Sequence, residues 1–154
     1  MINNSASATF YVDGGWLAAK YDYMSKQYLN LSIVAMRIAL GIIFFWFGGL
    51  KLLDYNPVFE IVYASFPFLA TGVGNLILGL FETLIGLGLI FNIFHKIIHP
   101  ALIFHLLGTF AVFIIAPEIM FDPYFPFLNL NGEFVVKNLS LAVGGLIVLT
   151  SQKN

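Results

Sequence analysis

Three ionisable residues interrupt the long apolar runs of this sequence: Arg37, Glu82 and His105. A charge that stands alone in hydrocarbon costs about 3 kcal/mol or more, so such residues pair with other polar groups and mark functional sites. An arginine and a glutamate can form an ion pair, and a histidine beside them can accept or donate a proton. These three residues are therefore the candidate intramembrane polar cluster, able to bind a small molecule or relay protons.

A second set of charged residues lies closer to the ends of the apolar runs: Lys51, Glu133 and Lys137. Glu133 and Lys137 are four residues apart, so on a helix they can also pair with each other. Lys51 and Lys137 can instead extend along the apolar surface to reach water. We expect these three residues to form an outer-face polar cluster. The sequence leaves open whether the buried charges serve function or only fix the register of the helices.

Several other chemistries are excluded or disfavoured by composition. The chain has no cysteine, which rules out disulfides, thiolate metal sites and cysteine nucleophiles. Only His105 lies deep in an apolar run, because His95 and His99 flank Lys96 at the edge of one, so no metal or haem site is predicted. No phosphate-binding loop or dinucleotide fingerprint is present. A net charge of −1 offers no basic patch, so nucleic acid is not an expected partner.

The elements that position these residues are apolar runs long enough to cross a bilayer. Of the 154 residues, 60% are hydrophobic and only 10% are charged, whereas soluble domains have about 25% charged residues. A spanning helix needs about 20 mostly apolar residues. Four runs qualify, at about residues 31–53, 70–91, 97–116 and 134–150. The predicted fold is an all-α, integral membrane four-helix bundle over residues 31–154, with the bilayer as partner and residues 1–30 as a cytoplasmic or interfacial N-terminal segment.

The distribution of lysines predicts the orientation, because positive residues stay on the cytoplasmic side. The segments before the first run, between the second and third, and after the fourth contain Lys20, Lys26, Lys96 and Lys153. The other two loops are acidic and contain Asp54, Glu60, Glu118, Asp122 and Glu133. Both termini are therefore predicted to be cytoplasmic. The second acidic loop also contains Pro117, Pro123 and Pro126, which disfavour a long helix there.

Each run carries small and polar residues at helical spacing, so that they share one face. These faces comprise Arg37, Gly41, Phe44, Gly48 and Lys51 in the first run, Asn75, Gly79, Glu82 and Gly86 in the second, Ala101, His105, Gly108 and Thr109 in the third, and Glu133, Lys137, Ser140 and Gly144 in the fourth. Small residues let helices approach closely and polar ones bond across the interface. We therefore expect the four faces to meet inside the bundle, with Leu, Ile and Phe facing lipid.

Depth in the bilayer suggests how the polar residues pair. With a rise of 1.5 Å per residue, Glu82 lies about 18 Å from the outer end of its run, and His105 lies at about the same level. Arg37 lies about 6 Å deeper if the outer ends of the runs are level. This predicts an ion pair between Arg37 and Glu82, with His105 as a third member.

Several short motifs resemble the DoxX-like family of small membrane proteins. Residues 36–41 (MRIALG) and 44–51 (FFWFGGLK) resemble the first helix of that family, with its arginine, aromatic run, glycine and lysine. Residues 81–88 (FETLIGLG) resemble its second-helix acid followed by glycine, and residues 132–139 (GEFVVKNL) resemble the opening of its last helix. The loop at residues 124–127 (YFPF) is similar to that of the YkgB-like branch. The likeness covers the chain from Leu31 onward.

The resemblance implies a four-helix protein of the bacterial inner membrane and several functions. Some relatives are subunits of a thiosulfate:quinone oxidoreductase, and others are linked to oxidative stress. We therefore expect an accessory subunit of a respiratory or redox complex, with other membrane subunits or further copies of the chain as partners. One alternative is a quinone-linked oxidoreductase subunit that binds a quinone or lipid in the bundle; another is an oligomeric transporter of protons or small solutes. Whether the chain is itself an enzyme is left open.

Overall fold

The computed structural model describes residues 12–151, which form two compact units, residues 12–35 and residues 36–151. The first eleven residues of the predicted N-terminal segment lie outside the described range, as does Lys153 from the orientation argument. Each unit is described by itself below.

Residues 12–35 form the first part of a long helix, α1 (Val12–Leu52). Its surface is rich in exposed aromatic and charged side chains. Lys20 Nζ lies 5.1 Å from the centre of the Trp16 ring, and Lys26 Nζ pairs with Asp22 Oδ2 at 2.8 Å. The described part of the predicted N-terminal segment is thus helical, and the helix begins well before the predicted start near residue 31.

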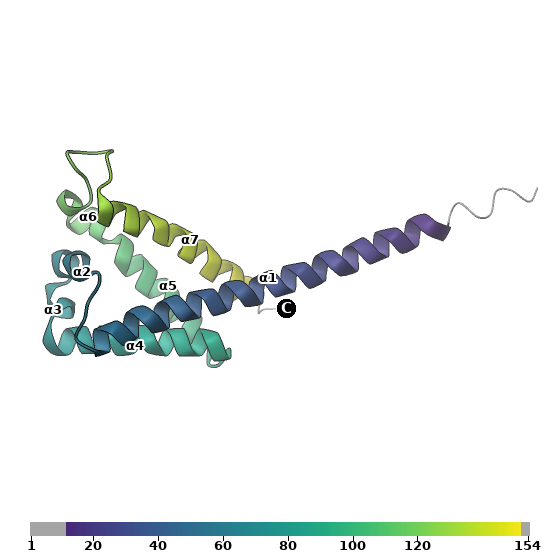
Figure 1. Ribbon diagram of the computed structural model, residues 1–154, viewed down its shortest axis with the longest axis horizontal. Coiled ribbons are helices and arrows are strands. Elements are labelled where there is room, and N and C mark those ends of the chain that lie inside the picture. The colour runs from purple at the N-terminus through teal and green to yellow at the C-terminus, as the bar shows by residue number, and fades with distance from the viewer. Residues whose placement is uncertain (1–11, 152–154) are drawn as a thin grey trace, which may run out of the picture. The chain divides into compact units, whose positions relative to one another are not determined.

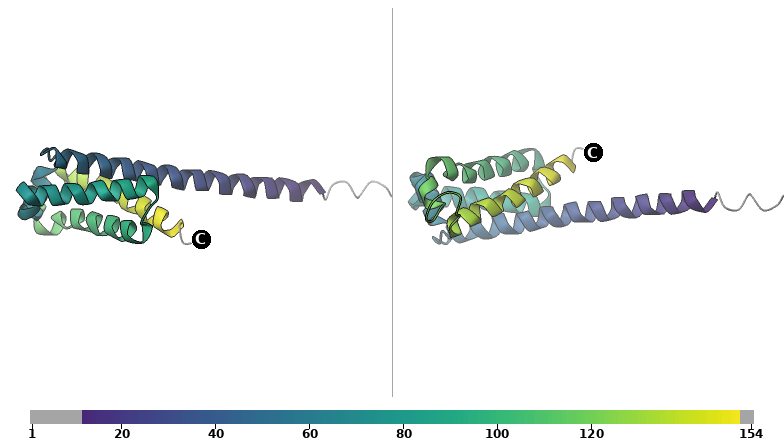
Figure 2. Two further views of the ribbon diagram at one scale, coloured as in Figure 1. Left: turned by 90° about the horizontal axis from the view of Figure 1, so that it is seen from below. Right: turned by 90° about the horizontal axis from the view of Figure 1, so that it is seen from above.

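The second unit, residues 36–151, is built from helices alone (Figure 1). After α1 come α2 (Phe59–Ser65), α3 (Pro67–Ala70), α4 (Gly72–Phe91), α5 (His95–Phe110), α6 (Val112–Ile115), the short 3-10 helix η1 (Pro117–Ile119) and α7 (Leu130–Ser151). Within this unit α1, α4, α5 and α7 run side by side, and the short helices gather where α1 ends and α7 begins (Figure 2). We call this the α2 end.

Within residues 12–151, four segments are long and apolar enough to cross a membrane: Ala19–Leu52, Gly72–Phe91, His95–Ile115 and Leu130–Ser151. They correspond to the four predicted spans, and the all-helical prediction is confirmed. Many large apolar side chains on these helices are exposed, for example Trp46, Leu80, Phe104 and Leu146. Such a surface suits lipid rather than water. The chain is therefore a multi-pass membrane protein.

Left-handed residues end two of the spanning helices. Asp54 has φ 61° after α1, and the Tyr55 N–H donates to the Leu50 carbonyl at 3.0 Å. Asn92 has φ 56° after α4, and the Ile93 N–H donates to the Gly88 carbonyl at 3.0 Å. Asp and Asn tolerate this conformation better than other residues with side chains, and the bonds satisfy carbonyls at the helix end. Lys51 is consequently fixed in the last turn of α1.

The proline-containing loop before α7 is folded without a long helix, as predicted. Asn129 links the start of this loop to the first turn of α7. Its side-chain amide donates to the Ile119 carbonyl at 3.0 Å, and its side-chain oxygen accepts from the Gly132 N–H at 3.0 Å. A buried apolar cluster lies beneath it and comprises Ile61, Val112, Ala116, Met120 and Val135. This cluster ties α2, α6 and α7 together at the α2 end.

Candidate functional site

Glycines bring the backbones of α1 and α4 into contact along the predicted stripes. A methyl group added at Gly48 would lie 2.6 Å from the Gly79 carbonyl oxygen, and one added at Gly86 would lie 2.7 Å from the Gly41 carbonyl oxygen. Both distances are shorter than van der Waals contact, so only glycine fits at these positions. This close approach places the side chains of Lys51 and Glu82 against each other.

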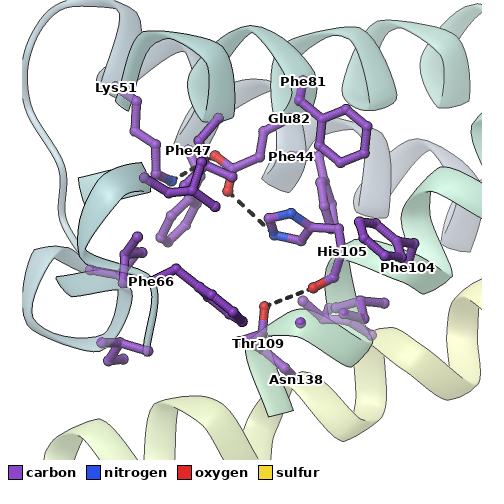
Figure 3. Close-up of a pocket in the computed structure, with 18 of the residues that line it drawn as sticks. Phe44, Phe47, Lys51, Phe66, Phe81, Glu82, Phe104, His105, Thr109 and Asn138 are labelled. Carbon is purple, nitrogen blue, oxygen red and sulfur yellow. Dashed lines mark hydrogen bonds and ion pairs between the residues drawn. The ribbon is translucent and has the colours of Figure 1, made fainter. Parts of the chain in front are cut away.

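Glu82 is the centre of a buried polar cluster at this contact. One carboxylate oxygen, Oε2, accepts a hydrogen bond from Lys51 Nζ at 2.6 Å, and the other, Oε1, lies 3.3 Å from His105 Nε2. Figure 3 shows the carboxylate pointing between these two groups. The side chains of Lys51 and Glu82 are 1% and 6% exposed. A short, charge-assisted bond of this kind compensates part of the cost of removing both charges from water.

Arg37 is not part of this cluster, and the predicted Arg37–Glu82 pair was wrong. Its guanidinium group donates instead to the backbone carbonyls of Leu89, and of Ile90 at 3.0 Å, at the end of α4. These carbonyls have no partner within the helix, and a cation there also favours the negative end of the helix dipole. Arg37 thus fastens α1 to the terminus of α4.

The error came from the assumed register of the two helices. The prediction took their ends to be level, but Leu52 at the end of α1 lies beside Gly79, since its nitrogen would be 3.2 Å from a methyl group there. Gly79 is seven residues into α4, which corresponds to about 10 Å along the axis. Lys51 therefore reaches Glu82, whereas Arg37 lies beyond its reach.

The predicted outer-face cluster of Lys51, Glu133 and Lys137 does not form. Lys51 pairs with Glu82, whereas Lys137 and Glu133 pair locally at 3.3 Å with side chains 72% and 54% exposed. On α7 the predicted stripe is wrong for Glu133, Lys137 and Ser140, which are all exposed, and right for Gly144. The buried face of α7 instead contains Gly132, Val135, Gly144, Gly145 and Val148.

A cavity of about 440 Å³ opens beside the Glu82 cluster (Figure 3). This volume lies within the range of about 300–1,000 Å³ that is usual for small-molecule sites. Seven phenylalanines contribute to its lining: Phe44, Phe47, Phe66, Phe68, Phe81, Phe104 and Phe134. The polar side chains of the lining are Lys51, Glu82, His105, Thr109 and Asn138. The cavity is thus apolar over most of its wall, with the polar cluster concentrated on one side.

Sequence reasoning missed Asn138 and placed Thr109 only on a polar stripe. The Thr109 hydroxyl donates to the His105 carbonyl at 3.1 Å, and Asn138 reaches the cavity from α7. Asn138 is three residues after the buried Val135 and seven before the buried Gly145, so the spacing of apolar positions would have identified its face. The prediction instead placed the adjacent Lys137 on the inner face of the helix, which was the wrong face.

A supporting layer of amides lies behind Lys51. The Asn75 amide donates to the Lys51 carbonyl at 3.2 Å, and its oxygen accepts from the Asn56 amide at 3.0 Å. Asn75 is buried in α4, one turn before Gly79. This network satisfies the Lys51 carbonyl at the end of α1 and ties the end of α1 to α4.

The arrangement is suited to binding and to proton exchange. Among residues 12–151, no three His, Asp or Glu side chains are grouped as metal ligands would be. Glu82 hydrogen-bonds an ammonium group and lies against an imidazole, which gives a short chain of polar contacts from α1 to α5 that borders the cavity. A molecule in the cavity would meet both the aromatic wall and this polar chain.

Comparison of the chain with models of protein families, with curated proteins and with solved structures finds no match. The resemblance to DoxX-like proteins therefore stays a prediction from the sequence motifs.

Proposed function

We propose that this chain is a DoxX-like protein of the bacterial inner membrane, with both termini in the cytoplasm, that binds a small lipophilic molecule inside its helix bundle. The observation that carries this proposal is the cavity of about 440 Å³ bordered by the buried Lys51–Glu82 pair. A charged pair is expensive to bury, and a helix bundle that needed only stability would fill the space beside it with apolar side chains.

The cavity favours the ligand-binding alternative, a quinone-linked subunit, over a purely structural role. An interior packed solid around Glu82 would have removed the reason to consider a ligand. The role of accessory subunit in a respiratory or redox complex stays a prediction, and it is compatible with a ligand in the bundle. The lysine distribution supports the proposed orientation.

Two glycines offer a matched test of ligand binding. A Cβ atom added at Gly108 or at Gly49 meets no heavy atom within 4 Å, but of the two only Gly108 lines the cavity. Gly108→Leu should therefore place its side chain in the cavity without a clash at its first carbon, whereas Gly49→Leu adds the same group elsewhere. The proteins would be purified in lipid nanodiscs, extracted for mass spectrometry of retained molecules, and titrated with a decyl-substituted benzoquinone.

We expect the wild type and Gly49→Leu to retain the same molecule or to bind the benzoquinone, and Gly108→Leu to lose it. Equal binding by all three proteins, or no binding above that of nanodiscs without protein, would refute the proposal. Circular dichroism and gel filtration of each variant establish that the fold is intact.

A further inference from the structure

The ammonium group of Lys51 has more hydrogen-bond donors than the surrounding residues can accept. It carries three N–H groups, and its side chain is 1% exposed. Glu82 Oε2 accepts one of them at 2.6 Å, and the ring of Phe47, with its centre 5.7 Å from Nζ, offers a weaker interaction with its face. Among the described residues no other acceptor bonds to Nζ. At least one donor is therefore left without an acceptor, and Lys51 is one of the residues that line the cavity.

A buried donor without an acceptor is costly, and more so when it is charged. The remaining polar residues of the cavity do not remove this cost. Figure 3 shows Thr109 and Asn138 on the opposite side of the cavity from Lys51 and Glu82. His105 contacts Glu82 through Nε2. An acceptor atom supplied by a molecule inside the cavity would complete the coordination of the ammonium group.

The charges that face the cavity determine the charge of that molecule. Among the described residues, Lys51 and Glu82 are the only Lys, Arg, Asp or Glu residues in its lining, and they neutralise each other. A carboxylate or an ammonium group brought into this space would stand without a counter-charge in a low-dielectric environment. The site is therefore suited to a neutral molecule.

The rest of the lining determines which chemical groups the remainder of the ligand must contain. Seven phenylalanine rings and several aliphatic side chains surround the space, and aromatic side chains pack well against flat or ring-shaped apolar groups. The charged groups are limited to one wall, and Thr109 and Asn138 on the opposite wall are neutral. A ligand with a single acceptor at one end and an apolar body matches this division.

We propose that the ligand is a neutral lipophilic carbonyl compound whose oxygen accepts a hydrogen bond from Lys51 Nζ. This inference rests on the proposed function, because it names the chemical class that the same cavity takes. Glu82 holds the ammonium group in place from the other side, so the carbonyl oxygen and the carboxylate share its donors. His105 holds the second oxygen of Glu82.

A series of probes with one common body tests the class. They are para-decylacetophenone, decylbenzene, para-decylbenzoate and para-decylbenzylammonium, titrated into the full-length protein in nanodiscs of zwitterionic lipid, with empty nanodiscs subtracted. A charge-assisted hydrogen bond corresponds to a preference of about tenfold or more. We expect the ketone to bind at least that much more tightly than the other three. The carbonyl stretching band of the bound ketone should move to lower frequency than in lipid.

Variants show whether Lys51 is the donor. Lys51→Met/Glu82→Gln removes both charges, so no uncompensated carboxylate is left to unfold the protein. It should lose the preference for the ketone over decylbenzene and the shift of the carbonyl band. Lys137→Met, which removes a lysine from an exposed pair outside the cavity, should keep both.

The outcomes separate the two proposals. If no probe binds above empty nanodiscs, the ligand-binding function and this inference both fail. If decylbenzene or the benzoate binds as tightly as the ketone, or if the double variant keeps the preference, the cavity binds lipophilic molecules but the assignment of the carbonyl to Lys51 is wrong.

Discussion

The buried Lys51–Glu82 pair should be far more sensitive to the loss of one partner than to the loss of both. Lys51→Met keeps the length of the side-chain stem and removes the ammonium group, which leaves Glu82 with only His105 at 3.3 Å. Both side chains are almost fully buried, at 1% and 6% exposed. Removing one partner of such a pair typically costs about 3–5 kcal/mol. Because His105 still contacts the carboxylate, we expect the lower end, about 3 kcal/mol.

The double variant Lys51→Met/Glu82→Gln should lie within about 1 kcal/mol of the wild type, since replacing a buried pair by neutral groups is often neutral. The exposed pair supplies the control, because Lys137→Met breaks an ion pair whose side chains are 72% and 54% exposed. Surface pairs contribute about 0.2–1 kcal/mol.

The measurement is the free energy of unfolding by sodium dodecyl sulfate in mixed micelles, followed by circular dichroism with refolding to establish reversibility. The reasoning would be refuted if Lys51→Met cost no more than Lys137→Met. It would also be refuted if the double variant lost as much free energy as the single variants Lys51→Met and Glu82→Gln added together, because the charges would then act independently.

Three further predictions concern the packing that holds the site. Gly86→Leu should destabilise the protein by about 1–3 kcal/mol or more, because the first carbon of the new side chain would lie 2.7 Å from the Gly41 carbonyl oxygen. The free energy of unfolding of this variant is compared with that of Gly49→Leu, and equal values would contradict the prediction. Arg37→Met should lower the free energy of unfolding by about 1.5–3 kcal/mol, because the hydrogen bonds to the Leu89 and Ile90 carbonyls are lost. Amide hydrogen exchange at the end of α4 should become faster, and unchanged exchange would contradict this role of Arg37. Asn129→Ala should lower the free energy of unfolding by about 1–2 kcal/mol, because the Asn129 side chain bonds both to the loop and to the first turn of α7. Proteolysis of the loop should become faster, and a loop that is cleaved no faster than in the wild type would count against this role.

The number and nature of the helices could be predicted because the membrane imposes a strong composition and length on each span. The buried face of α4 was also predictable: Asn75, Gly79, Glu82 and Gly86 are all buried as their spacing indicated. On α1 the same holds for Gly41, Gly48 and Lys51. In both helices the glycines mark the contact line, because only a residue without a side chain permits such an approach.

The partner of Glu82 could not be predicted because periodicity fixes the face of a helix but not its axial position relative to a neighbour. A shift of about 10 Å exchanges Arg37 for Lys51. The glycines contained the missing information: pairing Gly48 with Gly79 and Gly41 with Gly86 sets the register directly. The cavity and its Asn138 depend on how α5 and α7 diverge from that contact, which no local pattern specifies.

Because of the glycine contact between α1 and α4, the wall of the cavity that these two helices form is more rigid than the rest of its lining. Backbone atoms that already touch along Gly41, Gly48, Gly79 and Gly86 have no space into which to move, so Lys51 and Glu82 stand on a fixed support. Any accommodation of differently shaped occupants must then come from the other lining helices, among them α2, α5 and α7, which contribute Ile61, Phe104 and Phe134 to the lining. Molecules of different bulk would then bind through the same polar contact, while the other helices of the lining adjust to their shape.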